Sequence, residues 1–267
     1  MFHPEGTMWE VHRRQAIFLA GSRAMLMQLA YPPVAQAVAD TRFLEENPLQ
    51  RLRNTANAGI GLIYGTIESS QRIADGINHG HQRIHGPIQE TTGAWPAGSL
   101  YDATDPKQLA WVAATLIDSS LIGYERFVKP LSDDQKDQYV AEAKQLFGFV
   151  DMPEDELPSS YKDLQAYITE MIRSEQVKVG PLAQKLAPYT MLSHTSMRAA
   201  AMSMMRTITA DLLPPALKRQ FNMPISSGQK QLVKDFAAVV RAADHVLPKK
   251  ITQVAPVRQW DAILSPE

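Results

Sequence analysis

The stretch AIFLAGSRAMLMQLAYPPVAQAVA, from Ala16 to Ala39, decides the fold class. Large apolar side chains occupy nearly every side of a helix in its first half: Ile17, Phe18, Leu19, Met25, Leu26, Met27 and Leu29. A helix that is apolar all round is buried, so we expect a central helix here. Because Ser22, Arg23, Gln28 and a pair of prolines interrupt the stretch, it is a poor membrane span.

Helix start and stop signals extend this interpretation along the chain. Thr7-x-x-Glu10 predicts a capping box, and Tyr31-Pro32-Pro33 predicts a stop, so we expect one helix from Thr7 to about Ala30 and another from Pro33. A further helical segment begins at Asn47-Pro48 and continues to about Ile84, where Gly86-Pro87 ends it; its possible break points are Gly59, Gly61, Gly65, Gly76 and Gly80. Three more expected helices begin at Thr104-Asp105-Pro106 (through Leu121), at Ser132-x-x-Gln135 (to about Phe147) and at Ser160-x-x-Asp163 (to about Arg173). Another begins at Pro181. No alternating strand pattern or Asn-Gly hairpin signal stands out. The prediction is an all-α fold in a single multi-helical domain over residues 1–267.

Composition narrows the classes of function. The chain has 267 residues, 45% of them hydrophobic and 21% charged, which is typical of an ordinary globular protein. Its formal net charge of -1 argues against nucleic-acid binding, although local charged patches remain compatible with it. The absence of cysteine excludes disulfides, thiolate nucleophiles, iron–sulfur clusters and cysteine zinc sites. Because the N-terminus lacks the pattern of a secretory signal, we expect a cytoplasmic protein without integral membrane association.

Three histidines lie close together in INHGHQRIHGPI, the stretch from Ile77 to Ile88. On a helix, His81 interrupts the apolar stripe of Ile73, Ile77 and Ile84, so it should point inward. His85 lies one turn further on, whereas His79 projects to the opposite, solvated side. Three interpretations stay open for His81: a buried neutral imidazole, a zinc or two-metal ligand together with His85, or the axial ligand of a haem.

A second group of candidates lies in the preceding helix. Arg51 and Thr55 are one turn apart on one face, so a guanidinium and a hydroxyl group could address the same ligand. The simpler interpretation is a solvated helix start, in which Arg51 pairs with Glu45 or Glu46. Gly61 and Gly65 also share one face, and the lack of side chains there would permit the close approach of a flat ring.

In combination, these segments resemble the haem-dependent oxygenases that include latex clearing proteins (rubber oxygenases) and the MpaB-type oxygenase. The matching pieces are Trp9-Glu10-Val11-His12, Ala24 to Ala35, Asn47 to Thr55, Tyr64-Gly65, His81 to Gly86, Tyr101 to Pro106, Trp111-Val112 and Leu212-Leu213-Pro214-Pro215. Each piece is weak alone, but their order and spacing are hard to obtain by chance. The resemblance covers residues 9 to about 224.

The resemblance implies a globin-like helical core that binds one haem b (iron protoporphyrin IX). His81, Ile84 and Gly86 fall on the family's H-x-x-V-x-G motif, so His81 is implied to be the proximal iron ligand, with His85 at a variable position. Arg51 and Thr55 fall on the family's arginine and threonine near the haem, where Arg51 would stabilise negative charge on bound oxygen. His12, within a matched segment, and His194 are weaker candidates for cofactor neighbours.

The implied activity is an oxygenase that uses dioxygen (O2) to act on an apolar alkene or prenyl-type small molecule. Asn54 stands where the latex-clearing branch has a lysine before the threonine, so a lysine-capped resting state is not expected. Without an export signal, a small intracellular alkene, isoprenoid or lipid is a better expectation than rubber. The alternatives are a haem-binding or sensor protein without turnover, and a cofactor-free helical interaction protein in which the 12 methionines fill core gaps.

Overall fold

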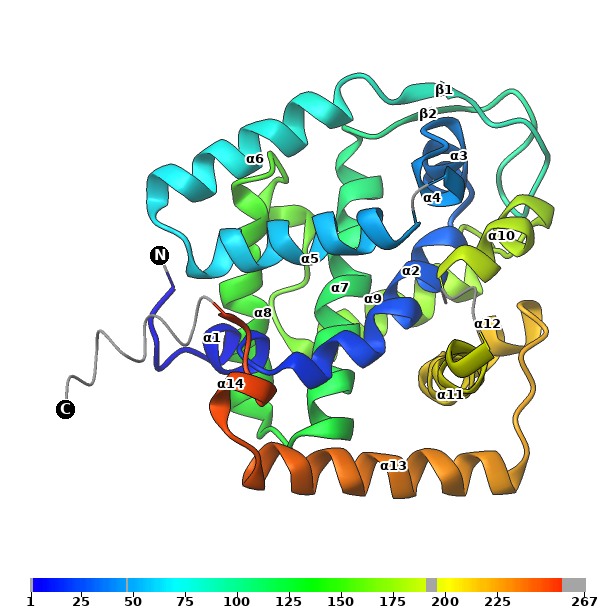
Figure 1. Cartoon of the computed structure of the whole chain (residues 1–267). Helices are drawn as coiled ribbons and strands as arrows, with labels where there is room; N and C mark the ends of the chain where they lie inside the picture. Colours follow the sequence, from blue (N-terminus) through cyan, green and yellow to red (C-terminus); the bar gives the residue numbers. More distant parts are fainter. Residues whose placement is uncertain (1, 47, 191–195, 256–267) are drawn as a thin grey trace.

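The structure is a computed structural model that describes residues 2–46, 48–190 and 196–255. Helices dominate it, which confirms the predicted all-α class (Figure 1). In chain order the elements are α1 Thr7–His12, η1 Gln15–Ala20, α2 Gly21–Leu29, α3 Pro32–Asp40, α4 Phe43–Glu46, α5 Pro48–Tyr64, α6 Ile67–His81, β1 His85–Pro87, β2 Leu100–Asp102, α7 Pro106–Phe127, α8 Asp133–Gly148, η2 Glu154–Glu156, α9 Tyr161–Arg173, α10 Pro181–Leu186, η3 Ala187–Thr190, α11 Ser196–Leu212, α12 Pro215–Gln220, α13 Ser227–Val246 and α14 Lys249–Thr252, where η denotes a 3₁₀ helix.

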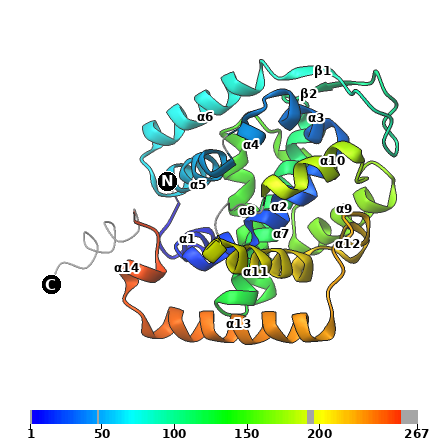
Figure 2. The same ribbon diagram turned by 45° about the vertical axis from the view of Figure 1, so that its right-hand side comes forward.

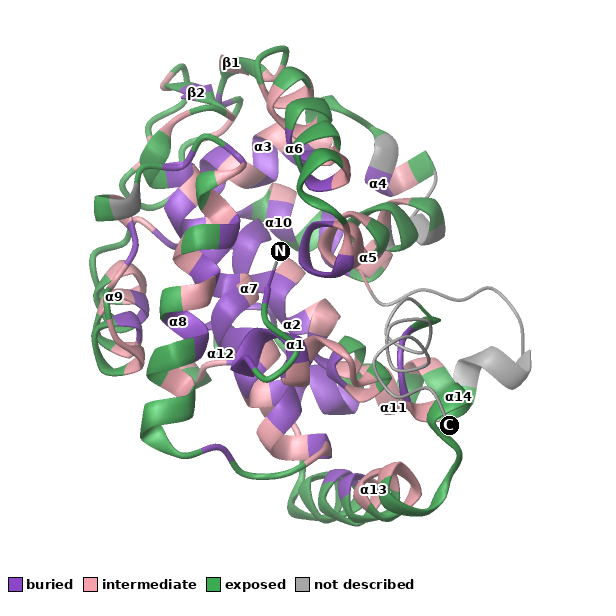
Figure 3. Cartoon of the chain, turned by 90° about the vertical axis from the view of Figure 1, so that its left-hand side faces the viewer, coloured by how far each residue is buried: buried purple, intermediate pink, exposed green. Residues whose placement is uncertain are grey.

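Helix α7 is the centre of the packing. It contacts η1, α2, α8, α9 and α13, and its side chains Trp111, Tyr124 and Phe127 are completely buried. The Trp111 indole N–H donates to the carbonyl oxygen of Met27 in α2, at 3.1 Å, which satisfies a polar group inside the core. Figure 3 shows the buried residues gathered around α7 and α2, with exposed residues on the outer helices α6 and α13.

The deciding apolar stretch is central, as predicted, but it is not part of one long helix. Leu26, Met27 and Leu29 are fully buried. The chain breaks at Arg14, whose backbone is extended (φ -88°, ψ 120°) and forms a β-bridge with Gln253. The expected helix from Thr7 to Ala30 is therefore three pieces, α1, η1 and α2, because a distant segment pairs with the backbone at the break.

The predicted capping box at Thr7 is also wrong. The N-cap is Gly6, and the Thr7 hydroxyl donates instead to Gln138 in α8, at 2.8 Å. Glu10 accepts a hydrogen bond from the Tyr124 hydroxyl and pairs with Arg14. Both side chains therefore bond to other helices instead of to the backbone at the start of α1. A local sequence pattern does not contain information about such distant partners.

Three other predicted helix starts are confirmed. Asp105, Ser132 and Ser160 each accept backbone N–H groups at the starts of α7, α8 and α9, and Ser132 forms a full capping box with Gln135. Helix α7 continues to Phe127, six residues beyond the expected end. Asn47 lies outside the described residues, but α5 does begin at Pro48, as predicted.

One small sheet was not expected. Strands β1 and β2 pair antiparallel, with His85 opposite Asp102 and Gly86 opposite Tyr101. Each strand has only three residues, which is too short for an alternating pattern to be recognised.

The outer edges of the molecule are formed by long helices. Helix α6 lies along one edge and α13 along the opposite edge, with α5 between α6 and the rest of the molecule, and this arrangement persists when the molecule is turned (Figures 1 and 2). In the described part of the chain, no helix combines the length and apolar character needed to cross a bilayer.

Candidate functional site

The candidate residues lie on the antiparallel pair α5 and α6. Thr66 forms the turn between them as the N-cap of α6 and accepts the Ser69 N–H at 3.2 Å. The Ser70 hydroxyl is 3.3 Å from the carbonyl oxygens of Gly61 and Leu62, so it holds the turn end of the pair together. Because the helices are antiparallel, the start of α5 and the end of α6 lie at the same end of the pair (Figure 1). Arg51 and His81 are therefore at one end.

His81 is the last residue of α6 and is half-buried. Burial lowers the pKa of its imidazole below the ordinary value of 6.5, so the neutral ring is the main form at neutral pH. Ile73 and Ile77, on the same stripe, are partly buried against the main core, in agreement with the expected inward face. A neutral, partly enclosed imidazole is the form that binds iron or another metal.

The other two histidines of the cluster lie elsewhere. His79 is exposed and contacts the side chain of Arg83, consistent with a surface position. The expectation that His85 follows His81 by one helical turn is wrong, because α6 ends at His81 and His85 begins strand β1. The His85 side chain is exposed and lies across from Asp102, whose pKa is lowered chiefly by hydrogen bonds from Thr104 and only slightly by His85.

Arg51 lies in the first turn of α5 and is partly buried. Its Nε atom is enclosed and has no hydrogen-bond partner. Burial lowers the pKa of its guanidinium below the ordinary value, as expected when a cation loses water. The proposed partner Glu45 pairs with Lys185 at 3.0 Å, and no ion pair among the described residues includes Arg51. The Nε atoms of Arg14 and Arg126 are enclosed in the same way, although both of those arginines are in ion pairs, so the enclosed Nε of Arg51 does not by itself indicate a ligand.

Thr55 and Asn54 have a different environment from Arg51. Both are exposed, and Asn54 accepts a hydrogen bond from the amide of Gln50 at 2.7 Å. The structure therefore brings Arg51 and His81 to one end of the helix pair, while it leaves Thr55 at the surface of α5. The role of Thr55 beside a ligand stays a prediction.

The two glycines serve the packing of α5 on α6. A methyl group at Gly61 would come within 2.4 Å of the Ile73 Cδ1 atom, and one at Gly65 within 2.3 Å of the Ser69 hydroxyl oxygen. Their missing side chains thus let the two helices approach each other. The role of both glycines beside a flat ring stays a prediction.

A polar network that the sequence did not reveal anchors the chain after His81. The buried Tyr101 in β2 donates its hydroxyl to Asp40 at the end of α3, at 2.5 Å. Gln36 donates to the other oxygen of Asp40 at 2.9 Å, and its own carbonyl oxygen accepts the Gln89 N–H. These groups are up to 61 residues apart, so no local pattern links them.

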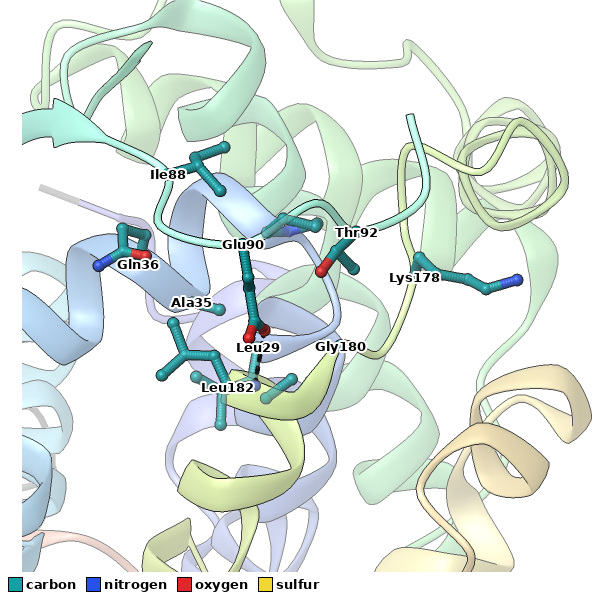
Figure 4. Close-up of a pocket in the computed structure, with 11 residues that line it drawn as sticks. Leu29, Ala35, Gln36, Ile88, Glu90, Thr92, Lys178, Gly180 and Leu182 are labelled. Atoms are coloured by element: carbon teal, nitrogen blue, oxygen red, sulfur yellow. Dashed lines mark hydrogen bonds between the residues drawn. The ribbon is translucent and has the colours of Figure 1, made fainter. Parts of the chain in front are cut away.

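The cavity beside this network is small. Leu29, Gln36, Glu90 and Leu182 are among the residues that line it, and Glu90 accepts the Leu182 N–H at 2.8 Å across it (Figure 4). Its volume of about 10 Å³ has room for a single water molecule. It is therefore a packing feature and not a substrate pocket.

The weaker histidine candidates are also placed in part. His12 lies 2.6 Å from the Tyr139 hydroxyl and stacks on the ring of Tyr139, between α1 and α8. His194 lies outside the described residues. Within residues 2–46, 48–190 and 196–255, no group of three or more His, Asp or Glu side chains gathers as it would around a metal ion held by the protein alone.

Comparisons with known proteins show the family of the chain. The family model described as ER-bound oxygenase mpaB/B′/rubber oxygenase, catalytic domain, matches residues 9–244. Two relatives are an uncharacterized protein of Mycobacterium bovis and one of Mycobacterium tuberculosis, each 24% identical over 232 residues, which cover 85% of this chain and 88% of the relative. No solved structure shows a significant match.

Proposed function

Because the chain belongs to the family of MpaB-type and rubber oxygenase catalytic domains, we propose that it is an oxygenase that binds haem b through His81 and uses O2 on an apolar alkene or prenyl-type small molecule. The oxygenase class follows from the family. The haem, its ligand and the substrate class are the proposal. The observation that carries it is the position of a half-buried, neutral His81 at the same end of the helix pair as Arg51, which forms no ion pair with another described residue.

The chemistry of His81 supports ligation. An iron ligand must offer a free nitrogen lone pair, and burial lowers the pKa of this imidazole below 6.5, which favours the neutral ring at neutral pH. The apolar neighbours Ile73 and Ile77 would exclude water from one side of a bound macrocycle. Because α6 ends at His81, the imidazole lies where the chain turns away toward β1, so no following helical turn covers it.

Arg51 supports the presence of an anionic or oxygen-rich partner. Its enclosed Nε–H would donate to a carboxylate of the bound haem or to an oxygen atom on which negative charge develops. When bound, haem supplies the redox chemistry that activates O2, and the chain supplies ligation, a dry environment and alignment. The apolar stripe on α6 is the kind of surface that retains an alkene.

The test of the haem assignment uses the visible spectrum of the purified protein after haem supplementation. We expect a Soret band in the wild type, its loss in His81→Ala, and its retention in His85→Ala, which removes an exposed imidazole four positions away. A colourless wild type, or a His81→Ala protein with an unchanged Soret band and unchanged haem affinity, would overturn the assignment.

Turnover is tested separately by oxygen consumption with prenyl alkenes of increasing length. We expect Arg51→Ala to lower the rate by roughly tenfold or more, since a positioned donor to developing charge is lost. Arg53→Ala is the matched control, because Arg53 is exposed two positions away. Haem binding without any oxygen consumption would favour the sensor alternative, and equal rates in both arginine variants would contradict the role of Arg51.

A further inference from the structure

The C-terminal half of α6 has little packing of its own. The two buried residues of this helix, Ser70 and Ala74, lie in the half nearer the turn from α5. In the other half, Ile77 is only partly buried, and the Asn78 amide makes a long hydrogen bond, at 3.4 Å, to the backbone at the end of α8. The position of His81, the last residue of α6, therefore depends on the segment that follows it.

Backbone hydrogen bonds connect His81 to the β1–β2 hairpin. The His81 carbonyl oxygen accepts the Ile84 N–H at 2.9 Å, and the Ile84 carbonyl oxygen accepts the Ala103 N–H, also at 2.9 Å. Ala103 directly follows β2, whose middle residue Tyr101 lies opposite Gly86 in β1. Two hydrogen bonds thus link the end of α6 to the strand that carries Tyr101.

Tyr101 attaches this hairpin to α3. Its side chain is buried, and its ring lies against Gly86, where an added Cβ atom would be 3.5 Å from the ring Cε1 atom. Its hydroxyl donates to the Asp40 carboxylate at 2.5 Å. Burial and the hydrogen bond to Asp40 raise the pKa of Tyr101, so the hydroxyl stays protonated and remains a donor at neutral pH.

The Asp40 acceptor is itself held in place. The buried Gln36, one turn earlier in α3, donates to the other Asp40 oxygen at 2.9 Å and accepts the N–H of Gln89, two residues after β1. Both strands of the hairpin are therefore tied to the last turns of α3. The bond from Tyr101 is the stronger type, because its acceptor is a carboxylate.

We propose that the Tyr101–Asp40 hydrogen bond positions His81, because it holds the hairpin on α3 and so fixes the end of α6 from which the imidazole would bind iron. This inference rests on the haem ligation proposed above. Tyr101 and Asp40 act through the chain and not through contact with the haem. Groups outside the ligand set that orient a metal ligand typically change the affinity for the metal by about 10–100-fold.

Hydrogen exchange of the haem-free full chain tests whether this bond holds the end of α6. Tyr101→Phe removes the hydroxyl and keeps the ring that packs on the hairpin. We expect the amides of residues 82–84 to exchange roughly tenfold faster in this variant, because local opening becomes easier. The amide of Ser70, which bonds to Thr66 at the other end of α6, should exchange at the wild-type rate.

Tyr124→Phe is the matched control. The buried Tyr124 donates in the same way to a carboxylate, that of Glu10 at 2.8 Å, but in the contact between α7 and α1. It should lower the overall stability by a similar amount and leave the exchange of residues 82–84 relative to Ser70 unchanged.

The haem-loaded protein tests the consequence for His81. Transfer of haem to excess apomyoglobin should be roughly tenfold faster for Tyr101→Phe and for Asp40→Ala. The double variant should lose haem no faster than either single variant, since both break the same bond. The electron paramagnetic resonance lines of the ferric Tyr101→Phe protein should broaden, because a loosened imidazole takes several orientations. Tyr124→Phe should match the wild type in both measurements.

The outcomes separate this inference from the haem assignment. Unchanged exchange of residues 82–84 in Tyr101→Phe, or an equal increase in Tyr124→Phe, overturns the positioning role. Faster exchange with unchanged haem loss and unchanged resonance lines overturns the link to the iron ligand. A wild type that takes up no haem overturns the haem assignment, and the exchange difference then still supports the bond as the element that holds residue 81.

Discussion

Helices α6 and α7 show two different uses of a long helix in one protein. In α7, 13 of 22 residues are buried, and an ion pair between Arg23 and Asp118 lies entirely inside the packing around it. In α6, only Ser70 and Ala74 among 15 residues are buried, and α5 is its main packing partner. The two helices therefore have different roles. Helix α7 stabilises the core of the fold, whereas α6, which has few buried residues, carries the candidate ligand His81 at its end.

This division has a physical reason. A side chain that binds a ligand must stay accessible to it, so part of the apolar face of its helix must remain unburied. Ile73 and Ile77 on α6 are only partly buried, whereas most of the residues of α7 are buried.

The largest effect is expected in the core. Asp118→Ala leaves the buried Arg23 guanidinium without its charge partner, which should lower the free energy of unfolding by about 3–5 kcal/mol. Asp211→Ala is the comparison, because the Arg126–Asp211 pair has the same 2.5 Å separation but is partly exposed, and it should cost about 1 kcal/mol or less. Urea denaturation measures both, and equal losses would contradict the view that complete burial makes the Arg23–Asp118 pair the more important one.

The next effect concerns the pH dependence of stability. Burial lowers the pKa of His12 from 6.5 to about 4, so the unfolded chain binds more protons between these pH values. The stability contributed by neutral His12 is therefore fully present above pH 6.5 and is lost as the pH falls toward 4. Since His12 keeps some solvent contact, we expect a loss of roughly 2–3 kcal/mol.

The free energy of unfolding is measured for the wild type and for His12→Gln between pH 4 and 6.5. Subtracting the two values at each pH removes the contribution of other titrating groups. The difference should change with pH for His12→Gln and change less for His81→Gln, since His81 lies at the thinly packed edge. A larger change for His81→Gln would mean that α6 is packed as tightly as the core.

The smallest effect compares two glycines of α5. Gly59→Ala adds a methyl group into open space and should stabilise the protein by up to about 1 kcal/mol, because alanine favours a helix. Gly61→Ala forces Ile73 aside, so a packing cost of about 1–3 kcal/mol offsets that gain. Thermal unfolding distinguishes the two. We also expect Gly61→Ala, but not Gly59→Ala, to retain haem more weakly. If both variants retain haem equally well, the spacing between α5 and α6 does not affect the candidate site.

Particular residues show how far prediction from sequence reached. The starts of α7, α8 and α9 were predictable because Asp105, Ser132 and Ser160 bond to backbone groups only two or three residues away. The same type of signal failed at Thr7, where the threonine and Glu10 bond to α8 and α7 instead. For the candidate site, the inward direction of His81 expected from helical spacing stays a prediction. The enclosure of the Arg51 Nε atom and the hydrogen bond between Tyr101 and Asp40, which lie 61 residues apart, did not follow from any local pattern.

The sequence by itself determined the all-α class, the starts of α5, α7, α8 and α9, and the family, because these depend on local bonding, on the spacing of apolar residues and on the order of short motifs. Only the tertiary structure decided where the first long helix breaks and that His85 leaves the helix of His81. These outcomes depend on which distant groups compete for a backbone or cover a face, and a one-dimensional pattern does not contain that competition.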